Sequence, residues 1–223
     1  MSKPVLSAVF VFALIASTAP AFAAEGPPQG VPAAGEAAAA PPAPDKNSGE
    51  PSKMYLGAGI GPGLGARFKV NGNTVTFSDQ FQGATDKTPP IAVNVASFGL
   101  ALNSKTFVGI DLSAVAQFGT IAGNTTHVQI NNYFAALTYF PWEKGLFVRG
   151  GVGLSNLVTF SGSQSDTVHG FGALLGAGYA LELSGRHHVT LTYTQTWQSY
   201  SSSGSKPDSS QFGAVYLGYM YRS

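Results

Sequence analysis

The stretch GFGALLGAGYALEL, residues 170–183, decides the fold of this chain. Bulky apolar residues alternate along it with small or polar residues, and a period of two is the repeat of a β-strand. One face carries Phe171, Leu175 and Tyr179, whereas the other is mostly glycine with the acid Glu182. A soluble barrel would hold its bulk inside, so this arrangement predicts a strand whose large side chains point outward into lipid.

The same alternation recurs from Met54 to Ser223. It predicts an all-β chain that forms an eight-stranded, antiparallel, up-and-down transmembrane β-barrel. The predicted strands lie at residues 54–69, 91–102, 108–118, 127–140, 146–155, 170–183, 188–200 and 215–221.

The first predicted strand places its even positions, including Ala66 and Phe68, on the outward apolar face. Arg67 and Lys69 then fall on the inward face with a series of glycines. Pro62 lacks an N–H donor, which predicts a bulge at that point. In two other strands, 91–102 and 127–140, the alternation leaves the facing open, near Ser97 and near Asn131.

The connections between the predicted strands alternate in length. Short turns on one side and long loops on the other place both ends of the barrel with the turns, which is the arrangement of bacterial outer-membrane barrels. The short turns are residues 103–106, 141–144 and 184–187, and the long polar loops are residues 71–90, 119–126, 161–168 and 201–210.

Aromatic residues gather near both ends of the predicted strands. Amphipathic rings favour the two interfaces of a bilayer, so this distribution predicts two aromatic girdles. The turn-side group comprises Tyr55, Tyr139, Phe140, Trp142, Tyr219 and Tyr221, and the loop-side group comprises Phe68, Phe118, Phe160, Phe171 and Trp197.

The beginning of the chain has the pattern of an export signal. Lys3 precedes an apolar run, residues 8–16, and Ala21-Phe22-Ala23 is a small-x-small cleavage pattern. We therefore expect a signal peptide at residues 1–23, a disordered Ala/Pro-rich linker at 24–53 and the barrel at 54–223. No apolar stretch reaches the roughly 18 residues that a spanning helix needs, so any crossing must use strands.

Composition excludes several classes of function. The sequence has no cysteine, which removes a disulfide framework and a thiol nucleophile. Its formal charge of +1 becomes zero once Lys3 leaves with the signal. A neutral chain has no electrostatic footprint for nucleic acid, so we expect no nucleic-acid partner.

At this point the sequence resembles the eight-stranded bacterial outer-membrane β-barrel family of the OmpA/OmpX type. The resemblance covers residues 54–223 and depends on hairpin patterns such as LFVRGGVGLS and GFGALLGAGYALEL. It implies a non-enzymatic protein in the bacterial outer membrane, with the role of an anchor, an adhesin, a small porin or an envelope-stabilising protein. Family members end their last strand on an aromatic; here Tyr219 and Tyr221 match, and Arg222 and Ser223 follow them.

No residue pattern predicts catalysis, a cofactor or a metal. The four histidines lack metal-ligand spacing, and His187 and His188 are adjacent, so a strand would point them to opposite faces. No Gly-x-Ser-x-Gly motif occurs, and strand alternation explains the glycine-rich runs better than a nucleotide loop does. We therefore predict no enzyme and no bound cofactor.

Three charged residues fall on inward faces: Asp111, Arg149 and Glu182. A loop centred near residue 165 would place Arg149 almost opposite Glu182. This predicts a structural ion pair in a lumen that its own side chains fill.

The sequence leaves three main functions open, with an outer-membrane lipid-modifying enzyme as a distant fourth. The first is a non-enzymatic outer-membrane barrel that is anchored in lipid and offers its loops to an extracellular ligand or surface; we expect it to be a monomer. The second is a narrow porin-like channel for small solutes. The third is a soluble lipocalin-like barrel, which would need apolar residues inside and polar residues outside.

Overall fold

The computed structural model of the protein describes residues 52–201 and 206–223. The signal peptide expected at residues 1–23 lies outside the described residues, as does the expected linker apart from Ser52 and Lys53. In the described part of the chain, no helix is long and apolar enough to cross a membrane.

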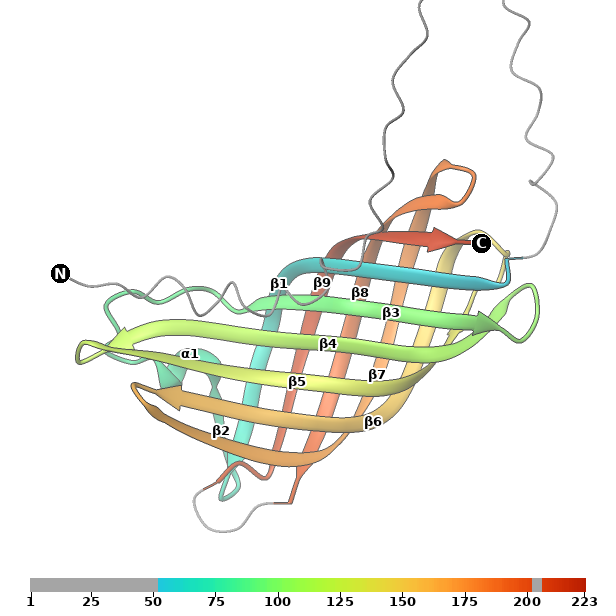
Figure 1. Cartoon of the computed structure of the whole chain (residues 1–223). Coiled ribbons are helices and arrows are strands. Elements are labelled where there is room, and N and C mark those ends of the chain that lie inside the picture. Colours follow the sequence, from blue (N-terminus) through green and yellow to red (C-terminus); the bar gives the residue numbers. More distant parts are fainter. Residues whose placement is uncertain (1–51, 202–205) are drawn as a thin grey trace, which may run out of the picture. The chain divides into compact units, whose positions relative to one another are not determined.

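Eight long strands form a closed antiparallel barrel, which confirms the predicted fold (Figure 1). Each strand pairs with its neighbour in sequence, and pairing of the first strand with the last closes the ring. A short strand and one helical turn interrupt the first long connection. The elements are β1 (Met54–Val70), β2 (Asn73–Thr76), α1 (Phe77–Gln80), β3 (Ile91–Ala101), β4 (Thr106–Ile121), β5 (Asn124–Tyr139), β6 (Gly145–Ser161), β7 (Gln164–Ser184), β8 (His187–Tyr200) and β9 (Ser209–Arg222).

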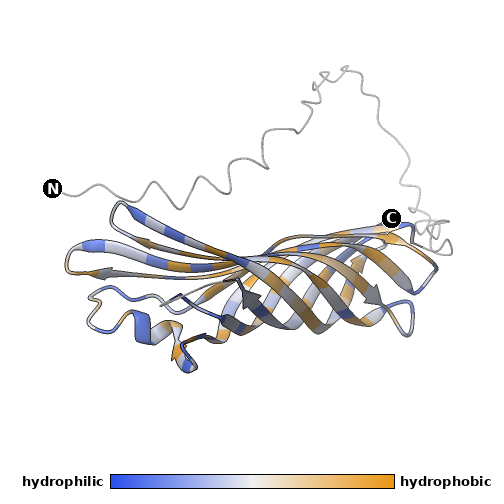
Figure 2. Ribbon diagram, turned by 90° about the horizontal axis from the view of Figure 1, so that it is seen from below, coloured by the Kyte–Doolittle hydropathy of each residue, from blue (hydrophilic) through white to orange (hydrophobic). Residues whose placement is uncertain are grey.

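The outer wall of the barrel is apolar, as the alternation predicts. On β7, Phe171 is 69% exposed and Leu175 is 60% exposed, whereas Leu174 between them is buried. Figure 2 shows hydrophobic residues concentrated toward the turn end and hydrophilic residues at the far ends of the hairpins. The apolar run on β1, from Leu56 to Leu64, is about 26 Å long at ~3.3 Å per residue, or about 20 Å along the barrel axis at a tilt of ~40°. This height suits the hydrocarbon layer of an outer membrane.

A bulge in β1 corrects the predicted facing of four residues. Gly65 has a φ of +57°, and the register against β9 shifts between Leu64 and Arg67. The extra residue exchanges the two faces of the strand. Ala66 and Phe68 therefore lie inside the barrel, and Arg67 and Lys69 lie outside; the sequence interpretation was wrong for all four. Glycine adopts this positive φ without strain, which is why this bulge forms at Gly65 and not at Pro62.

The two facings that the sequence left open are also resolved. The register of β3 shifts between Asn94 and Ala96, so that Asn94 and Ser97 both point inward while Val95 points outward. In β5 the alternation continues without a break, and Asn132 is buried. The irregular alternation in β3 is therefore caused by a bulge. In β5 there is no irregularity: Asn131 and Asn132 are adjacent polar residues that point to opposite faces.

Two of the predicted long loops are mostly strand. The β4–β5 hairpin turns at Ala122 and Gly123, both with positive φ, and the β6–β7 hairpin turns at Gly162. The strands continue through the expected loops because each residue finds a cross-strand partner, and His127 stacks on Phe160 at a centroid distance of 4.1 Å. These two hairpins therefore extend the wall of the barrel at its loop end (Figure 1).

The predicted aromatic girdles are only partly correct. Trp142, Tyr139 and Tyr219 at the turn side, and Phe171 and Trp197 at the loop side, are exposed on the outer wall. Three members of the predicted girdles are instead buried in the lumen: Tyr55, Phe68 and Phe140.

Candidate functional site

A buried ion pair lies in the turn-side half of the lumen. Arg149 on β6 and Asp111 on β4 point into the barrel, and Nη1 of Arg149 is 2.6 Å from Oδ2 of Asp111. Their side chains are only 5% and 2% exposed. A charge at such a place requires a partner of opposite charge and further hydrogen bonds.

Neighbouring polar side chains supply these hydrogen bonds. The Asp111 carboxylate accepts from Asn94 at 2.9 Å and from Ser97 at 2.7 Å. Arg149 donates to Ser97 at 2.7 Å and to Thr138 at 3.2 Å. The bulge in β3 brings Asn94 and Ser97 onto the inward face together, so this network could not be found from strand alternation alone.

Glu182 does not join this network, and the predicted Arg149–Glu182 contact is wrong. The β6–β7 turn lies closer to β6 than expected, so Arg149 is registered with Gly176. Glu182 lies opposite His188 near the turn end and contacts Lys144 at 3.5 Å, where both side chains are largely exposed. The ion-pair partner of Arg149 is instead Asp111 on β4, which the long Arg149 side chain reaches inside the lumen.

An apolar core fills the loop-side half of the lumen. The helical turn α1 contributes Phe77, and its C-cap residue is Phe81; they are 1% and 2% exposed. Thr76 and Asp79 form a capping box that begins α1, since each side chain bonds the backbone N–H of the other. The core comprises Ala66, Phe68, Phe77, Phe81, Ala92, Val115, Val128, Ile130, Leu157, Val168, Tyr200, Phe212, Ala214 and Tyr216.

Residues 71–90 are predicted from the sequence as a long polar loop. In the structure α1 and Phe81 instead fold into the lumen, where they form a plug. The sequence does contain a signal for it: the pattern Thr76-x-x-Asp79 is typical of a helix start, and Phe77 and Phe81 are spaced four apart, on one side of a helical turn. Their burial against β1 residues could not be predicted, because the sequence interpretation placed Phe68 on the outer wall.

We expect Phe81→Ala to loosen the plug. Replacing a buried phenylalanine by alanine normally lowers the free energy of unfolding by ~3–5 kcal/mol. Here the loss is limited to about 2 kcal/mol, because α1 can leave the lumen as a unit while the barrel stays folded. Trypsin cleavage after the exposed Lys87 should accelerate in folded protein. The control Gln82→Ala alters an exposed neighbour and should cleave at the parental rate; equal rates for all three proteins would contradict a docked plug.

The capping box gives this plug a dependence on acid. Hydrogen bonds from the Thr76 backbone and side chain lower the pKa of Asp79 from its ordinary value of 3.8. The ionised carboxylate therefore stabilises α1 fully above that value, and the contribution disappears as the pH falls through the lowered pKa. Hydrogen exchange of the α1 amides, corrected for intrinsic rates, should accelerate as the pH falls below 3.8 and through the lowered pKa of Asp79. Asp79→Ala should show the faster exchange already at neutral pH; an unchanged α1 in that variant would exclude the cap as the cause.

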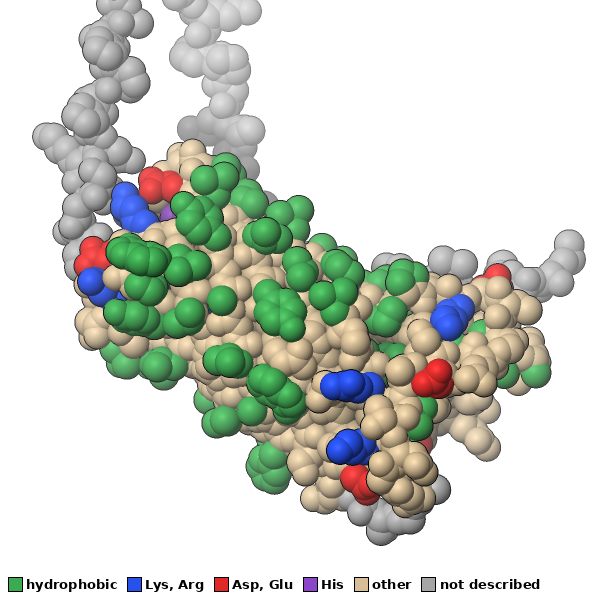
Figure 3. Space-filling view, turned by 180° about the vertical axis from the view of Figure 1, so that it is seen from behind, with side chains coloured by type: hydrophobic (Ala, Val, Ile, Leu, Met, Phe, Trp, Pro, Cys, Tyr) green, Lys and Arg blue, Asp and Glu red, His purple; other side chains and the backbone are tan. Residues whose placement is uncertain are grey.

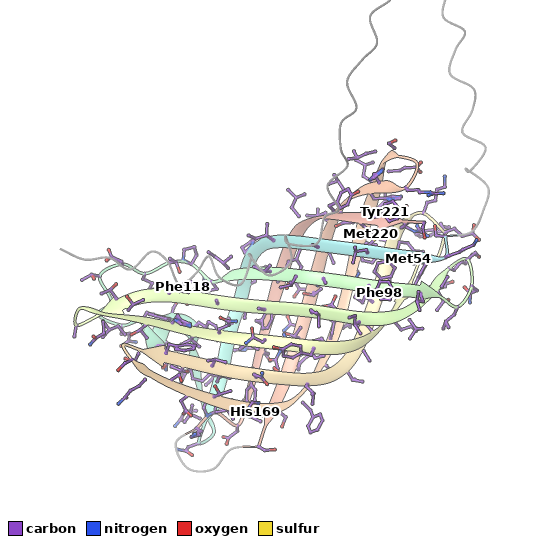
Figure 4. All side chains as sticks on the ribbon, viewed as in Figure 1. Met54, Phe98, Phe118, His169, Met220 and Tyr221 are labelled. Carbon is purple, nitrogen blue, oxygen red and sulfur yellow. The ribbon has the colours of Figure 1, made fainter. Side chains whose placement is uncertain are left out.

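A second aromatic cluster closes the turn end of the lumen. Tyr55, Phe107, Phe140 and Phe147 are buried there in edge-to-face or tilted contacts. The guanidinium of Arg222 lies 4.3 Å from the ring centre of Phe140, where a cation–π contact is favourable. Figure 4 places Met220, two residues before Arg222 in β9, at this end of the barrel. The ion-pair network thus lies between two apolar closures.

The four histidines do not converge. His127 lies on the outer wall and His169 bonds Asn156 at 3.0 Å, while His187 is exposed and His188 is buried on the opposite face, as expected. Among the described residues, no group of three or more His, Cys, Asp or Glu side chains could hold a metal ion. No hydrogen bond between a serine and a histidine occurs in residues 52–201 and 206–223.

A surface depression of about 420 Å³ lies where β7 meets the segment after β8. Leu154 and Phe171 contribute apolar surface, and His169 and Lys206 contribute polar groups. Lys206 is held by Asp166 at 2.9 Å, so its charge is compensated. The depression is therefore lined by both apolar and polar side chains.

Comparison with known proteins shows the fold. No protein-family model matches this sequence, and no curated protein matches it. Ail, the attachment invasion locus protein of Yersinia pestis, solved with the heparin analogue sucrose octasulfate, is 14% identical, with a TM-score of 0.50 over 78% of this chain and 100% of that one. Neisserial surface protein A is 12% identical, with a TM-score of 0.48 over 76% of this chain and 97% of that one. The outer membrane protein OprG from Pseudomonas aeruginosa is 13% identical, with a TM-score of 0.41 over 79% and 98%. The match to Ail, together with the closed barrel of eight long strands, shows that the chain has the fold of the eight-stranded outer-membrane β-barrels.

Proposed function

We propose that this protein is a non-enzymatic anchor in the bacterial outer membrane, which it reaches by means of a cleaved signal peptide. Its barrel is held by outer-membrane lipid, and the ends of the β4–β5 and β6–β7 hairpins offer a surface to an extracellular ligand or another surface. The single observation that carries this proposal is the lumen: apolar side chains close it at both ends, around a fully paired Arg149–Asp111 network.

The same observation argues against the porin-like alternative. A conducting pore needs a continuous polar path, and the aromatic cluster around Phe107 and the plug around Phe81 interrupt such a path. The direction of the side chains argues against the lipocalin-like alternative. A soluble barrel would hold its large apolar residues inside, whereas those of β7 are exposed on the outer wall. The proposed role requires no nucleic-acid partner and no oligomer.

Planar-bilayer recording tests the closed lumen. The purified full chain should give no stable conductance steps, whereas steps of the order of hundreds of picosiemens would support the channel instead. The triple variant Phe77→Ala/Phe81→Ala/Phe107→Ala, which removes bulk from both closures, shows whether the assay can detect opening.

Cysteine labelling tests the proposed orientation, because the chain has no native cysteine. Ser163→Cys lies at the β6–β7 turn, and Lys144→Cys lies at the opposite end of the barrel. In intact cells, a membrane-impermeant maleimide should label Ser163→Cys and leave Lys144→Cys unlabelled until the outer membrane is opened. The reverse labelling pattern would show that the barrel has the opposite orientation, and it would refute the proposal that the hairpin ends face the outside of the cell.

A further inference from the structure

The Gly65 bulge places two cations on the outer wall. Arg67 and Lys69 follow Leu64, the last outward apolar residue of β1. Across the strands, Arg67 is registered with Gln211 and Lys69 with Ser209. One strand further, Trp197 faces Gln211 and Ser199 faces Ser209. We call these six side chains the loop-side cationic patch: Arg67, Lys69, Trp197, Ser199, Ser209 and Gln211.

The charge of this patch is not compensated. Among the described residues, three ion pairs occur, and neither Arg67 nor Lys69 belongs to one. The partner of Arg67 is neutral: with the Gln211 amide turned so that its oxygen faces the guanidinium, that oxygen accepts from Nε at 2.8 Å and from Nη2 at 2.5 Å. This contact orients the guanidinium and leaves its positive charge unbalanced.

Two acidic residues of the loop side are engaged elsewhere: Asp79 accepts from the backbone of Thr76, and Asp166 pairs with Lys206. Asp208 donates its backbone N–H to the Lys69 carbonyl, but its carboxylate forms no ion pair with Lys69. Among the described residues, no carboxylate therefore lies within ion-pair distance of Arg67 or Lys69.

The patch lies at the level of lipid head groups. Because of the bulge, Leu64 and Arg67 are registered with Gly213 and Gln211, so Arg67 lies only two strand positions beyond Leu64. That is about 7 Å along the strand and about 5 Å along the barrel axis at a tilt of ~40°. Trp197 is 43% exposed at the same boundary, which is the position that tryptophan favours in a membrane. Figure 3 shows apolar side chains over the wall and charged ones toward the ends of the barrel.

We propose that the loop-side cationic patch binds the phosphate of an anionic lipid in the leaflet on the loop side. Guanidinium presents a donor fork that matches phosphate, Lys69 adds a mobile charge, and the hydroxyls of Ser199 and Ser209 complete the donors. Cationic side chains at a membrane surface attract anionic lipid, and the apolar belt below the patch accepts the acyl chains. This inference depends on the proposed insertion in a membrane.

Lipid-specific quenching of Trp197 tests the site. The chain has two tryptophans, and Trp142 lies at the opposite end of the barrel, so Trp142→Phe in the full chain leaves a single reporter beside the patch. The protein is reconstituted in phosphatidylcholine vesicles that contain either brominated phosphatidylglycerol or brominated phosphatidylcholine. We expect the anionic lipid to bind near Trp197 about fivefold more strongly than the zwitterionic one.

Matched variants separate the patch from other cations. Arg67→Gln with Lys69→Gln should reduce the roughly fivefold preference to nearly one, because both positive charges of the patch are removed. Lys206→Gln, a compensated loop-side cation, and Lys105→Gln, at the turn side, should each retain it. A preference that survives the double substitution, or that disappears in Lys206→Gln alone, would overturn the proposal.

Two further outcomes distinguish this proposal from the proposed function. If neither brominated lipid quenches Trp197 although the barrel is folded, the wall does not face lipid, and the membrane anchor itself is refuted. If both lipids quench equally and the double substitution has no effect, the barrel is inserted but the phosphate site is absent. Competition by millimolar inorganic phosphate would assign the patch to a soluble anion and overturn the lipid assignment.

Discussion

Asp111→Ala is expected to destabilise the folded barrel by about 3–5 kcal/mol, because it leaves Arg149 charged and unpaired in the lumen. The side chains concerned are almost fully buried, so water cannot replace the lost carboxylate. The Asn94 amide loses its acceptor at the same time, and Ser97 keeps only Oδ1 of Asn94 as an acceptor. Urea unfolding in lipid vesicles, followed by tryptophan emission and by the heat-modifiable shift on gels, measures the loss.

Two variants check the cause of this effect. Glu182→Ala removes the acid that strand alternation predicted as the partner, and it should change the free energy of unfolding by no more than about 0.5 kcal/mol, since its pair with Lys144 is exposed. Asp111→Leu combined with Arg149→Met removes both charges and should be less destabilising than Asp111→Ala alone. Equal losses for Asp111→Ala and Glu182→Ala would disprove the assignment.

Gly153→Ala is expected to cost about 3 kcal/mol or to prevent assembly. Gly153 faces the lumen, and a Cβ built on it would lie 2.1 Å from the carbonyl oxygen of Tyr133 and 2.9 Å from Cα of Phe134. Both of these are backbone atoms of the neighbouring strand, so the β5–β6 pairing itself would have to separate. Refolding yield into vesicles and urea midpoint measure the effect.

Gly150→Ala on the same strand is the matched control. Gly150 points outward, and the nearest atom that its Cβ would meet is the Leu174 carbonyl oxygen at 3.8 Å. The substitution should be neutral or stabilise by up to about 1 kcal/mol, because alanine restricts the unfolded chain. If the two variants behave alike, close approach of β5 and β6 does not explain the inward glycines.

The inward glycines and the plug together explain how side chains fill the lumen of so narrow a barrel. Where strands approach closely, as at Gly153, no side chain is tolerated. Bulk then has to come from elsewhere, and the first loop supplies it through Phe77 and Phe81. The hairpins of β4–β5 and β6–β7 extend the wall of the barrel at the same end.

The sequence determined the class of fold because the alternation of apolar and small residues is local. The alternation can be recognised within a single strand such as 170–183, without knowledge of the neighbouring strands. It predicted the number of strands, their order and the outward direction of Phe171 and Leu175. It also identified Arg149 and Asp111 as charges inside the barrel.

Only the tertiary structure decided which charges meet and which residues change faces. A single added residue at Gly65 reverses the facing of everything after it in β1, and pattern alone had placed that irregularity at Pro62. The β6–β7 turn lies a few residues before the predicted position, so Arg149 is not opposite Glu182. Its partner in the structure is Asp111. Facing depends on the parity of each strand, and pairing depends on the register between strands; both are settled by long-range hydrogen bonds and packing, which a single-strand pattern does not contain.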